Sequence, residues 1–244
     1  MTGQRTSRLR VHYRDPHGAP QVATVEDMAG IAFENCPAVR TIESYPGQWH
    51  TPGQYWSATT GTLLAYESFL ECQWLTLLDF DPTIAAINTQ ALEIRARDHD
   101  GAWRHVPDVF ARRVNGSVLI VDVKHPRRRD SPAVERQEKR TADACRQLGW
   151  DYRMVDAPPA QRHANIAWLA GYRRPLHAVA HLEPEIVAAA AQPVRIGDLA
   201  ATMPAPLLVR PVIFHLLWRH RLVCDLDTPL RERTLVRAAE GTSR

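Results

Sequence analysis

The chain has 244 residues, of which 45% are hydrophobic and 23% are charged. This balance favours a folded globular protein with a sizeable core and argues against wholesale disorder. No run of about eighteen apolar residues occurs, so we do not expect the chain to be a membrane protein. Because no apolar stretch follows the basic N-terminal residues, we also expect no secretion signal and a cytoplasmic location.

The charged residues show one unusual bias. Of the 30 cationic side chains only Lys124 and Lys139 are lysine, and the net charge is +3. Such a mild positive charge permits a nucleic-acid partner without requiring one. The four cysteines stand far apart, without the spacing of a zinc site or a disulfide framework. A lysine in this chain therefore calls for a chemical reason, because arginine fills nearly every other cationic position.

The N-terminal half begins without clear periodicity. Residues 1–55 are rich in Pro, Gly, His and aromatic residues, and we predict an irregular arm with at most one short strand. Its arginines, Arg5, Arg8, Arg10 and Arg14, could contact DNA or belong to a disordered tail. Apolar residues at helical spacing then predict a helix over residues 63–80, ending near Asp81 and Pro82.

Three segments of strand character follow, at 84–97, 103–113 and 117–124. Asn115-Gly116 separates the last two and predicts an antiparallel hairpin. Ser131-Pro132 then starts a helix that closes at Gly149, and residues 151–157 form a short strand. This order of elements predicts an α/β unit, followed by helical segments at about 161–172 and 182–191.

The C-terminal stretch has its own pattern. Residues 195–203 and 206–220 predict two helices, and residues 221–227 and 234–238 predict a hairpin. This succession suggests a winged-helix-like α+β domain. We therefore expect an arm over 1–55, an α/β domain over 56–160, a helical connector over 161–192 and a winged-helix-like domain over 193–244.

Three residues of the predicted hairpin form a candidate site. Side chains two apart in a strand share a face, so Asp122 and Lys124 point the same way, and the turn can bring Asp108 near Asp122. Converging carboxylates suit a hard divalent cation such as Mg²⁺. Alternatively, Asp122 and Lys124 could form an exposed ion pair while Asp108 merely starts a turn. His105 and His125 are expected at the rim rather than as ligands.

The Pro107-Asp108 and Asp122-x-Lys124 pattern resembles that of the PD-(D/E)XK nuclease superfamily. The resemblance implies a restriction-endonuclease-like mixed sheet flanked by helices, in which acids hold Mg²⁺ and lysine activates or positions a water. Mn²⁺ could substitute for Mg²⁺. Lysine and arginine are not interchangeable in such a role, because arginine does not readily lose its proton. A third acid should lie on the preceding helix, where Glu67 and Glu71 share one face and periodicity cannot choose between them.

From Tyr55 to Asp156 the chain is similar to TnsA-like endonuclease subunits of heteromeric transposases. The similarity lies in YWSATTG, ESFLE, LLDFDPTIAAINTQ, VPDVF, VLIVDVK and LGWDYRMVD. It implies that Glu71 is catalytic with Asp108, Asp122 and Lys124. Glu67 and Gln90 are then support residues. The implied metal ligands are Glu71, Asp108, Asp122 and Val123.

The same resemblance implies a function and its partners. Such a subunit hydrolyses the non-transferred strand at the 5′ ends of a transposon, in double-stranded DNA. A TnsB-like DDE transposase joins the 3′ ends, and a TnsC-like ATPase regulates the complex. The basic residues expected to follow DNA phosphates are Arg127, Arg128, Arg129, Arg136 and Arg140. The alternatives are a standalone nuclease of defence, repair or junction resolution, and a non-catalytic DNA-binding assembly module.

Overall fold

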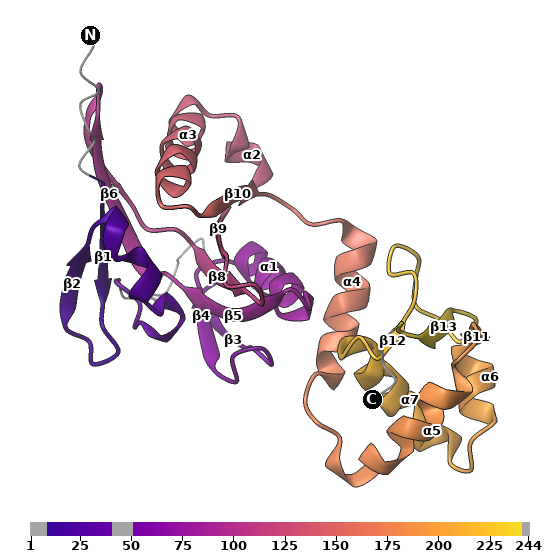
Figure 1. Cartoon of the computed structure of the whole chain (residues 1–244). Coiled ribbons are helices and arrows are strands. Elements are labelled where there is room, and N and C mark those ends of the chain that lie inside the picture. Colours follow the sequence, from indigo (N-terminus) through magenta and orange to yellow (C-terminus); the bar gives the residue numbers. More distant parts are fainter. Residues whose placement is uncertain (1–8, 41–50, 241–244) are drawn as a thin grey trace. The chain divides into compact units, whose positions relative to one another are not determined.

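The computed structural model describes residues 9–40 and 51–240. The chain divides between Ala157 and Pro158 into two compact units, which are described separately below (Figure 1). The architecture is mixed α/β with several sheets, one of them mixed. Within the described ranges, none of the helices is long and apolar enough to cross a bilayer.

The candidate site is built on a four-stranded sheet of the first unit. Its order is β10 (Asp151–Val155), β9 (Val118–Val123), β8 (Val109–Arg113) and β5 (Ile84–Thr89). The pair β10 and β9 is parallel, and the other two pairs are antiparallel. The predicted Asn115-Gly116 hairpin is confirmed, with Gly116 at a φ of 85°. Every residue of β9 is buried, so both faces of this strand are covered.

Helices α1 (Phe69–Phe80) and α3 (Pro132–Gln147) contribute to the two apolar clusters that cover β9. Leu75 of α1 packs with Leu119 and Val121, whereas Cys145 of α3 packs with Ile120. The predicted helix start at residue 63 is wrong, because residues 63–66 form β4 (Leu63–Tyr66), which pairs with β3 (Gly53–Trp56). The side chain of Ser68 caps α1 instead.

A second four-stranded sheet corrects the expectation of an irregular arm. Its order is β2 (Pro20–Ala23), β1 (Arg10–Arg14), β6 (Leu92–Asp98) and β7 (Gly101–His105). Of the two N-terminal strands, β1 pairs with β6, which lies about eighty positions later in the chain, and β2 pairs with β1. The short helices η1 (Val25–Gly30) and η2 (Phe33–Asn35) follow, and α2 spans Pro126–Arg129. Arg5 and Arg8 lie outside the described residues.

Two segments predicted as single strands are each divided between the sheets. The first breaks at Gln90, which adopts a φ of 52°, and the second breaks at Val106–Asp108. A positive φ is uncommon outside glycine and turns the chain out of the extended conformation. Pro107 has no N–H to donate to a ladder. Both breaks therefore let β5 and β8 lie in one sheet while β6 and β7 lie in the other.

The second unit contains the predicted helices and an antiparallel ribbon. Its elements are α4 (Ala160–Leu169), η3 (Ala170–Tyr172), η4 (His177–Leu182), α5 (Glu183–Ala189), β11 (Val194–Arg195), α6 (Ile196–Ala201), α7 (Pro206–Trp218), β12 (Leu222–Val223) and β13 (Leu235–Ala238). The sheet order is β11, β13, β12. Residues 161–192, expected as a connector, belong to this unit, because α4 and α5 both contact α7.

A buried carboxylate anchors α1 to the loop after β3. Asp79 accepts hydrogen bonds from the hydroxyls of Tyr55 (2.8 Å) and Ser57 (2.7 Å) and from the N–H groups of Ala58 (2.9 Å) and Thr59 (2.7 Å). Only 6% of Asp79 is exposed. A buried charge is tolerated when hydrogen bonds replace its hydration. Asp79 therefore fixes the C-terminal end of the helix that carries Glu71.

We expect Asp79→Ala to lower the free energy of unfolding by about 3 kcal/mol or more, because it leaves several buried donors without an acceptor. Denaturant titration measures this loss. The control is Asp143→Ala, which removes an exposed carboxylate paired with Arg146 and should cost no more than about 1 kcal/mol. Equal stability of the two variants would contradict the anchoring role of Asp79.

Candidate active site

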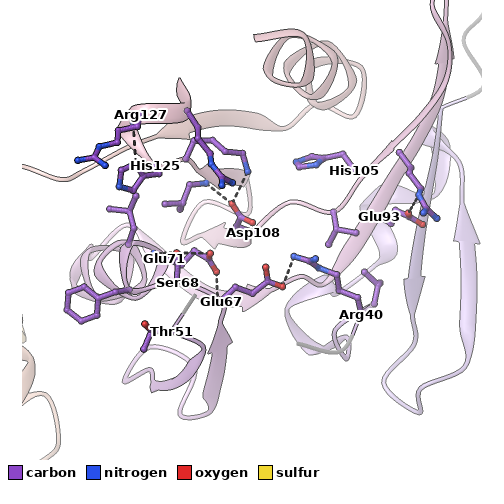
Figure 2. A pocket seen from close by; sticks show the side chains of 18 of the residues that line it. Arg40, Thr51, Glu67, Ser68, Glu71, Glu93, His105, Asp108, His125 and Arg127 are labelled. Carbon is purple, nitrogen blue, oxygen red and sulfur yellow. Dashed lines mark hydrogen bonds and ion pairs between the residues drawn. The ribbon is translucent and has the colours of Figure 1, made fainter. Parts of the chain in front are cut away.

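One cavity of about 1170 Å³ lies where the two sheets of the first unit meet α1 and α2 (Figure 2). It gathers most of the residues that the hairpin motif and the preceding helix predict. Its lining includes Arg40, Glu67, Glu71, Glu93, Arg95, Arg104, His105, Asp108, Val123, Lys124, His125, Arg127 and Arg128. The cavity thus combines carboxylates with a lysine and several arginines.

Asp108 lies between β7 and β8, at the centre of the view in Figure 2. Its Oδ2 accepts a hydrogen bond from the N–H of Val123 at 2.7 Å and lies 3.8 Å from Nζ of Lys124. Burial, followed by the charge of Asp122, raises the pKa of Asp108 to about 7, although Lys124 opposes this shift. Asp108 is therefore a desolvated carboxylate that a single lysine compensates only in part.

Asp122 occupies the opposite kind of environment. Its side chain has no exposed surface, and Oδ2 lies 2.7 Å from Nε2 of His105 and accepts a hydrogen bond from the Tyr152 hydroxyl at 2.8 Å. The N–H of Asp108 donates to Oδ1 at 3.3 Å. Burial would raise the pKa of Asp122, but the hydrogen bond and charge of His105, with Lys124 and Tyr152, outweigh it and lower the pKa. Asp122 does not line the cavity.

Glu71 sits in the first turn of α1 and faces the cavity. Its Oε1 accepts a hydrogen bond from the Ser68 hydroxyl at 2.9 Å, and its Oε2 accepts one from the N–H of Glu67 at 2.8 Å. Burial raises the pKa of Glu71, and these hydrogen bonds and Lys124 only partly oppose the shift. Both oxygens are thus bonded to the two residues that precede α1, which positions the carboxylate before any ligand arrives.

Glu67 also lines the cavity, but it is tied to other partners. Its Oε1 lies 2.7 Å from a guanidinium nitrogen of Arg40 and accepts a hydrogen bond from Nε2 of Gln90 at 2.9 Å. The N–H of Gln90 donates to the carbonyl oxygen of Asp108 at 3.2 Å. Gln90 is only 2% exposed, and its Oε1 is buried without a hydrogen-bond partner among the described residues. Gln90 thus connects Glu67 to the backbone of Asp108.

The five arginines predicted to follow DNA occupy different environments. Arg127 and Arg128 line the cavity, whereas Arg136 is exposed on α3 and is not one of the lining residues. Arg129 pairs with Glu138 through two contacts of 3.1 Å. Arg140 makes contacts of 2.7 and 3.0 Å with Asp98. These ion pairs already use the charges of Arg129 and Arg140 within the fold.

The donor set suits a divalent cation, although not through all three predicted carboxylates at once. In the described part of the chain, only Asp98, His99 and Asp100 bring three acidic or histidine ligand atoms within 4.8 Å of one another. Arg140 forms ion pairs with both of those aspartates, which explains why the two carboxylates lie close together. The carboxylates of Glu71, Asp108 and Asp122 do not form such a set, because Asp122 is turned toward His105 and Tyr152. Glu71 and Asp108, desolvated and undercompensated, remain suitable oxygen ligands beside Val123.

Sequence reasoning missed two residues that shape this site, Tyr152, which holds Asp122, and Arg40, which holds Glu67. It placed His105 at the rim, where His105 does line the cavity, but it did not foresee the contact of His105 with Asp122. Strand alternation could have placed His105 on the inward face of its strand, two residues after Trp103. Arg40 and Tyr152 carried no such local signal, because their partners are distant in the sequence.

Comparison with protein-family models finds no family that matches the chain. Comparison with curated proteins finds no matching relative.

We expect Asp108→Asn to stabilise the metal-free protein above pH 7. An unfolded aspartate titrates near pH 3.9, whereas Asp108 titrates at about 7 in the fold, so the wild type loses stability as pH rises through this window. Asparagine carries no charge and can still accept the hydrogen bond of Val123. The gain should be about 2 kcal/mol or more at about pH 8 and should vanish near pH 4.

Denaturant titrations in the presence of a chelator measure this difference at both pH values. The exposed control, Asp143→Asn, should show no comparable pH-dependent gain. Added Mg²⁺ should stabilise the wild type more than Asp108→Asn, because a ligand that binds the folded state raises stability. A wild type and Asp108→Asn of equal stability at both pH values would contradict the raised pKa.

Proposed function

We propose that the protein is a Mg²⁺-dependent endonuclease that hydrolyses phosphodiester bonds of double-stranded DNA. The observation that carries this proposal is the convergence of Glu71, Asp108 and Lys124 in one cavity, with Arg127 and Arg128 among its lining residues. Oxygen ligands, a lysine and arginines together match the needs of a polyanionic substrate and its metal. Mn²⁺ could replace Mg²⁺ at such a site.

Glu71 and Asp108 would hold the ion, with the main chain of Val123 beside them. When bound, the ion neutralises charge that develops on the phosphate. In hydrolysis the oxygen of water forms a bond to phosphorus, the bond to one sugar oxygen breaks, and a proton reaches the departing oxygen. Lys124 would position the water and its proton near the phosphate. Arg127 and Arg128 would bind neighbouring phosphates, and Asp122 would hold β9 in place through His105 and Tyr152.

We further propose that this nuclease acts as a TnsA-like subunit of a heteromeric transposase. The motifs from Tyr55 to Asp156 support this proposal, as does the order of helix, strands, helix and strand in the first unit. The second unit would serve as a winged-helix-like module for partner proteins, namely a TnsB-like transposase and a TnsC-like ATPase. Two leucines of α7, Leu207 (84% exposed) and Leu208 (52% exposed), would suit such a protein contact.

A standalone nuclease of defence, repair or junction resolution is a second candidate. The observation in support of this candidate is that the cavity and its charged residues all come from the first unit. A non-catalytic DNA-binding module is a third, since the Asp122 carboxylate is already occupied by His105 and Tyr152. Cleavage of DNA by the purified chain alone would favour the standalone nuclease, and Mg²⁺-independent binding without cleavage under any condition would favour the module.

We expect Asp108→Ala to reduce 5′-strand cleavage by at least about a hundredfold, because it removes a carboxylate that would hold the ion beside the reacting phosphate. The assay combines the variant with a matching TnsB-like subunit on transposon-end DNA and resolves the two strands. Joining of the 3′ ends should persist, since that reaction belongs to the partner. Asp143→Ala serves as the control and should cleave normally. Unchanged 5′ cleavage by Asp108→Ala would refute the site.

Lys124→Arg should lower the cleavage rate by roughly a hundredfold or more, although the charge is kept, because a guanidinium neither shares its proton readily nor fits the space of an ammonium group. The chain supplies a matched control in Lys139→Arg, which changes the other lysine at an exposed position of α3. That variant should cleave at the wild-type rate. Near-normal cleavage by Lys124→Arg would show that the position needs only a positive charge.

A further inference from the structure

The outward face of the sheet β2-β1-β6-β7 is strongly basic. Along these strands, Val11, Tyr13, Leu92, Ile94 and Trp103 point inward and pack in an apolar cluster with residues of α3. Strand alternation therefore turns the intervening positions outward. Those positions include five arginines from three strands: Arg10, Arg14, Arg95, Arg97 and Arg104.

Three of these arginines form a row across the sheet. Arg10 of β1 is paired with Arg95 of β6, and Arg95 is paired in turn with Arg104 of β7. The side chains of Arg95 and Arg104 are 47% and 77% exposed. Like charges placed opposite one another in neighbouring strands destabilise a sheet. Folding alone does not account for such a row, so a ligand of opposite charge is the simpler explanation.

The row is compensated only in part. Among the outward positions of these four strands, all of which are described, Glu93 is the one acid. Its carboxylate accepts a hydrogen bond from Nε of Arg95 at 2.6 Å and lies 3.7 Å from Nε of Arg104. Within residues 9–40 and 51–240, neither Arg10 nor Arg97 forms an ion pair. The face thus keeps a clear excess of positive charge.

The basic row is continuous with the candidate active site. Arg95 and Arg104 line the same cavity as Asp108 and Lys124. Figure 2 shows Glu93 on one side of Asp108 and Arg127 on the other. Because Glu93 contacts Arg95 and Arg104, cationic groups lie on both sides of Asp108. Strands lie about 4.8 Å apart, so the row extends about 10 Å, which corresponds to about three base-pair steps along the axis of a DNA duplex.

We propose that Arg10, Arg95 and Arg104 bind the phosphate backbone of duplex DNA beside the bond that is cut. This inference rests on the proposed function and adds the surface that holds the flanking duplex. The contacts are to phosphates, so the row sets the position of the DNA without reading its sequence. Arg127 and Arg128 hold the backbone on the other side of Asp108.

The test measures duplex binding by the full-length chain, using fluorescence anisotropy of a labelled duplex in the presence of a chelator, so that no cleavage occurs. The variant Arg10→Gln/Arg104→Gln removes two charges of the row and leaves the pair between Arg95 and Glu93. Its affinity should fall roughly tenfold, and the slope of log affinity against log salt between about 50 and about 200 mM should shrink by about 2. Its melting temperature should be unchanged or higher, since opposed charges are removed.

The matched control is Arg146→Gln/Arg153→Gln, which removes two exposed arginines of the same unit outside the row. It should bind like the wild type. The inference is overturned if the wild type does not bind duplex DNA, if Arg10→Gln/Arg104→Gln binds with wild-type affinity and slope, or if the control loses as much affinity.

The two proposals can fail separately. If Arg10→Gln/Arg104→Gln weakens binding while Asp108→Ala leaves cleavage intact, the catalytic site is wrong and the DNA surface stands. If Asp108→Ala abolishes cleavage and Arg10→Gln/Arg104→Gln binds normally, only the surface is wrong.

Discussion

The buried carboxylate of Asp122 is the contact on which the candidate site depends. It joins His105 at the end of β7, Tyr152 of β10 and the backbone of Asp108 before β8, so it links the two sheets of the first unit at one point. A carboxylate without exposed surface is stable only when such partners replace its water. By holding β9 in this position, Asp122 sets where Val123 and Lys124 meet Asp108.

Asp108 and Asp122 show how neighbouring carboxylates acquire different properties. His105 and Tyr152 satisfy Asp122 and keep its pKa low, whereas burial and the charge of Asp122 raise the pKa of Asp108. Pairs of acids whose surroundings drive their pKa values apart are typical of functional sites. His105 and Tyr152 already satisfy Asp122 within the fold, whereas Asp108 is only partly compensated, which is the reason for proposing Asp108 as a ligand of the cation. The small net charge of the whole chain conceals both this pair of buried acids and the basic sheet face beside it.

The arginines also fall into two groups, those whose charge is paired within the fold and those whose charge is available to a ligand. Arg129 and Arg140 are held by Glu138 and Asp98, so their charges stabilise the region around α3. Arg10, Arg95 and Arg104 are instead aligned against one another on an exposed face. Arg129 and Arg140 were predicted as DNA contacts because they lie close to other arginines in the sequence. Arg10, Arg95 and Arg104 are far apart in the sequence and are brought together by strand pairing. The position of an arginine in the fold therefore predicts its binding partner better than its closeness to other arginines in the sequence.

The sequence by itself determined the locally encoded features: the Asn115-Gly116 hairpin, the helix that starts at Pro132, and the motif residues Asp108 and Lys124. A turn type, a helix cap and strand alternation each depend on a few adjacent residues, so they can be read from the chain. Only the tertiary structure decided the pairing of β1 with β6, the turn of the backbone at Gln90 and the orientation of Asp122 toward His105 and Tyr152. These depend on contacts between distant segments, whose burial and hydrogen bonding outweigh local preference. The same reason explains why Glu71, Asp108 and Lys124 line the cavity, whereas Asp122, which was predicted to act with them, contacts His105 and Tyr152 instead.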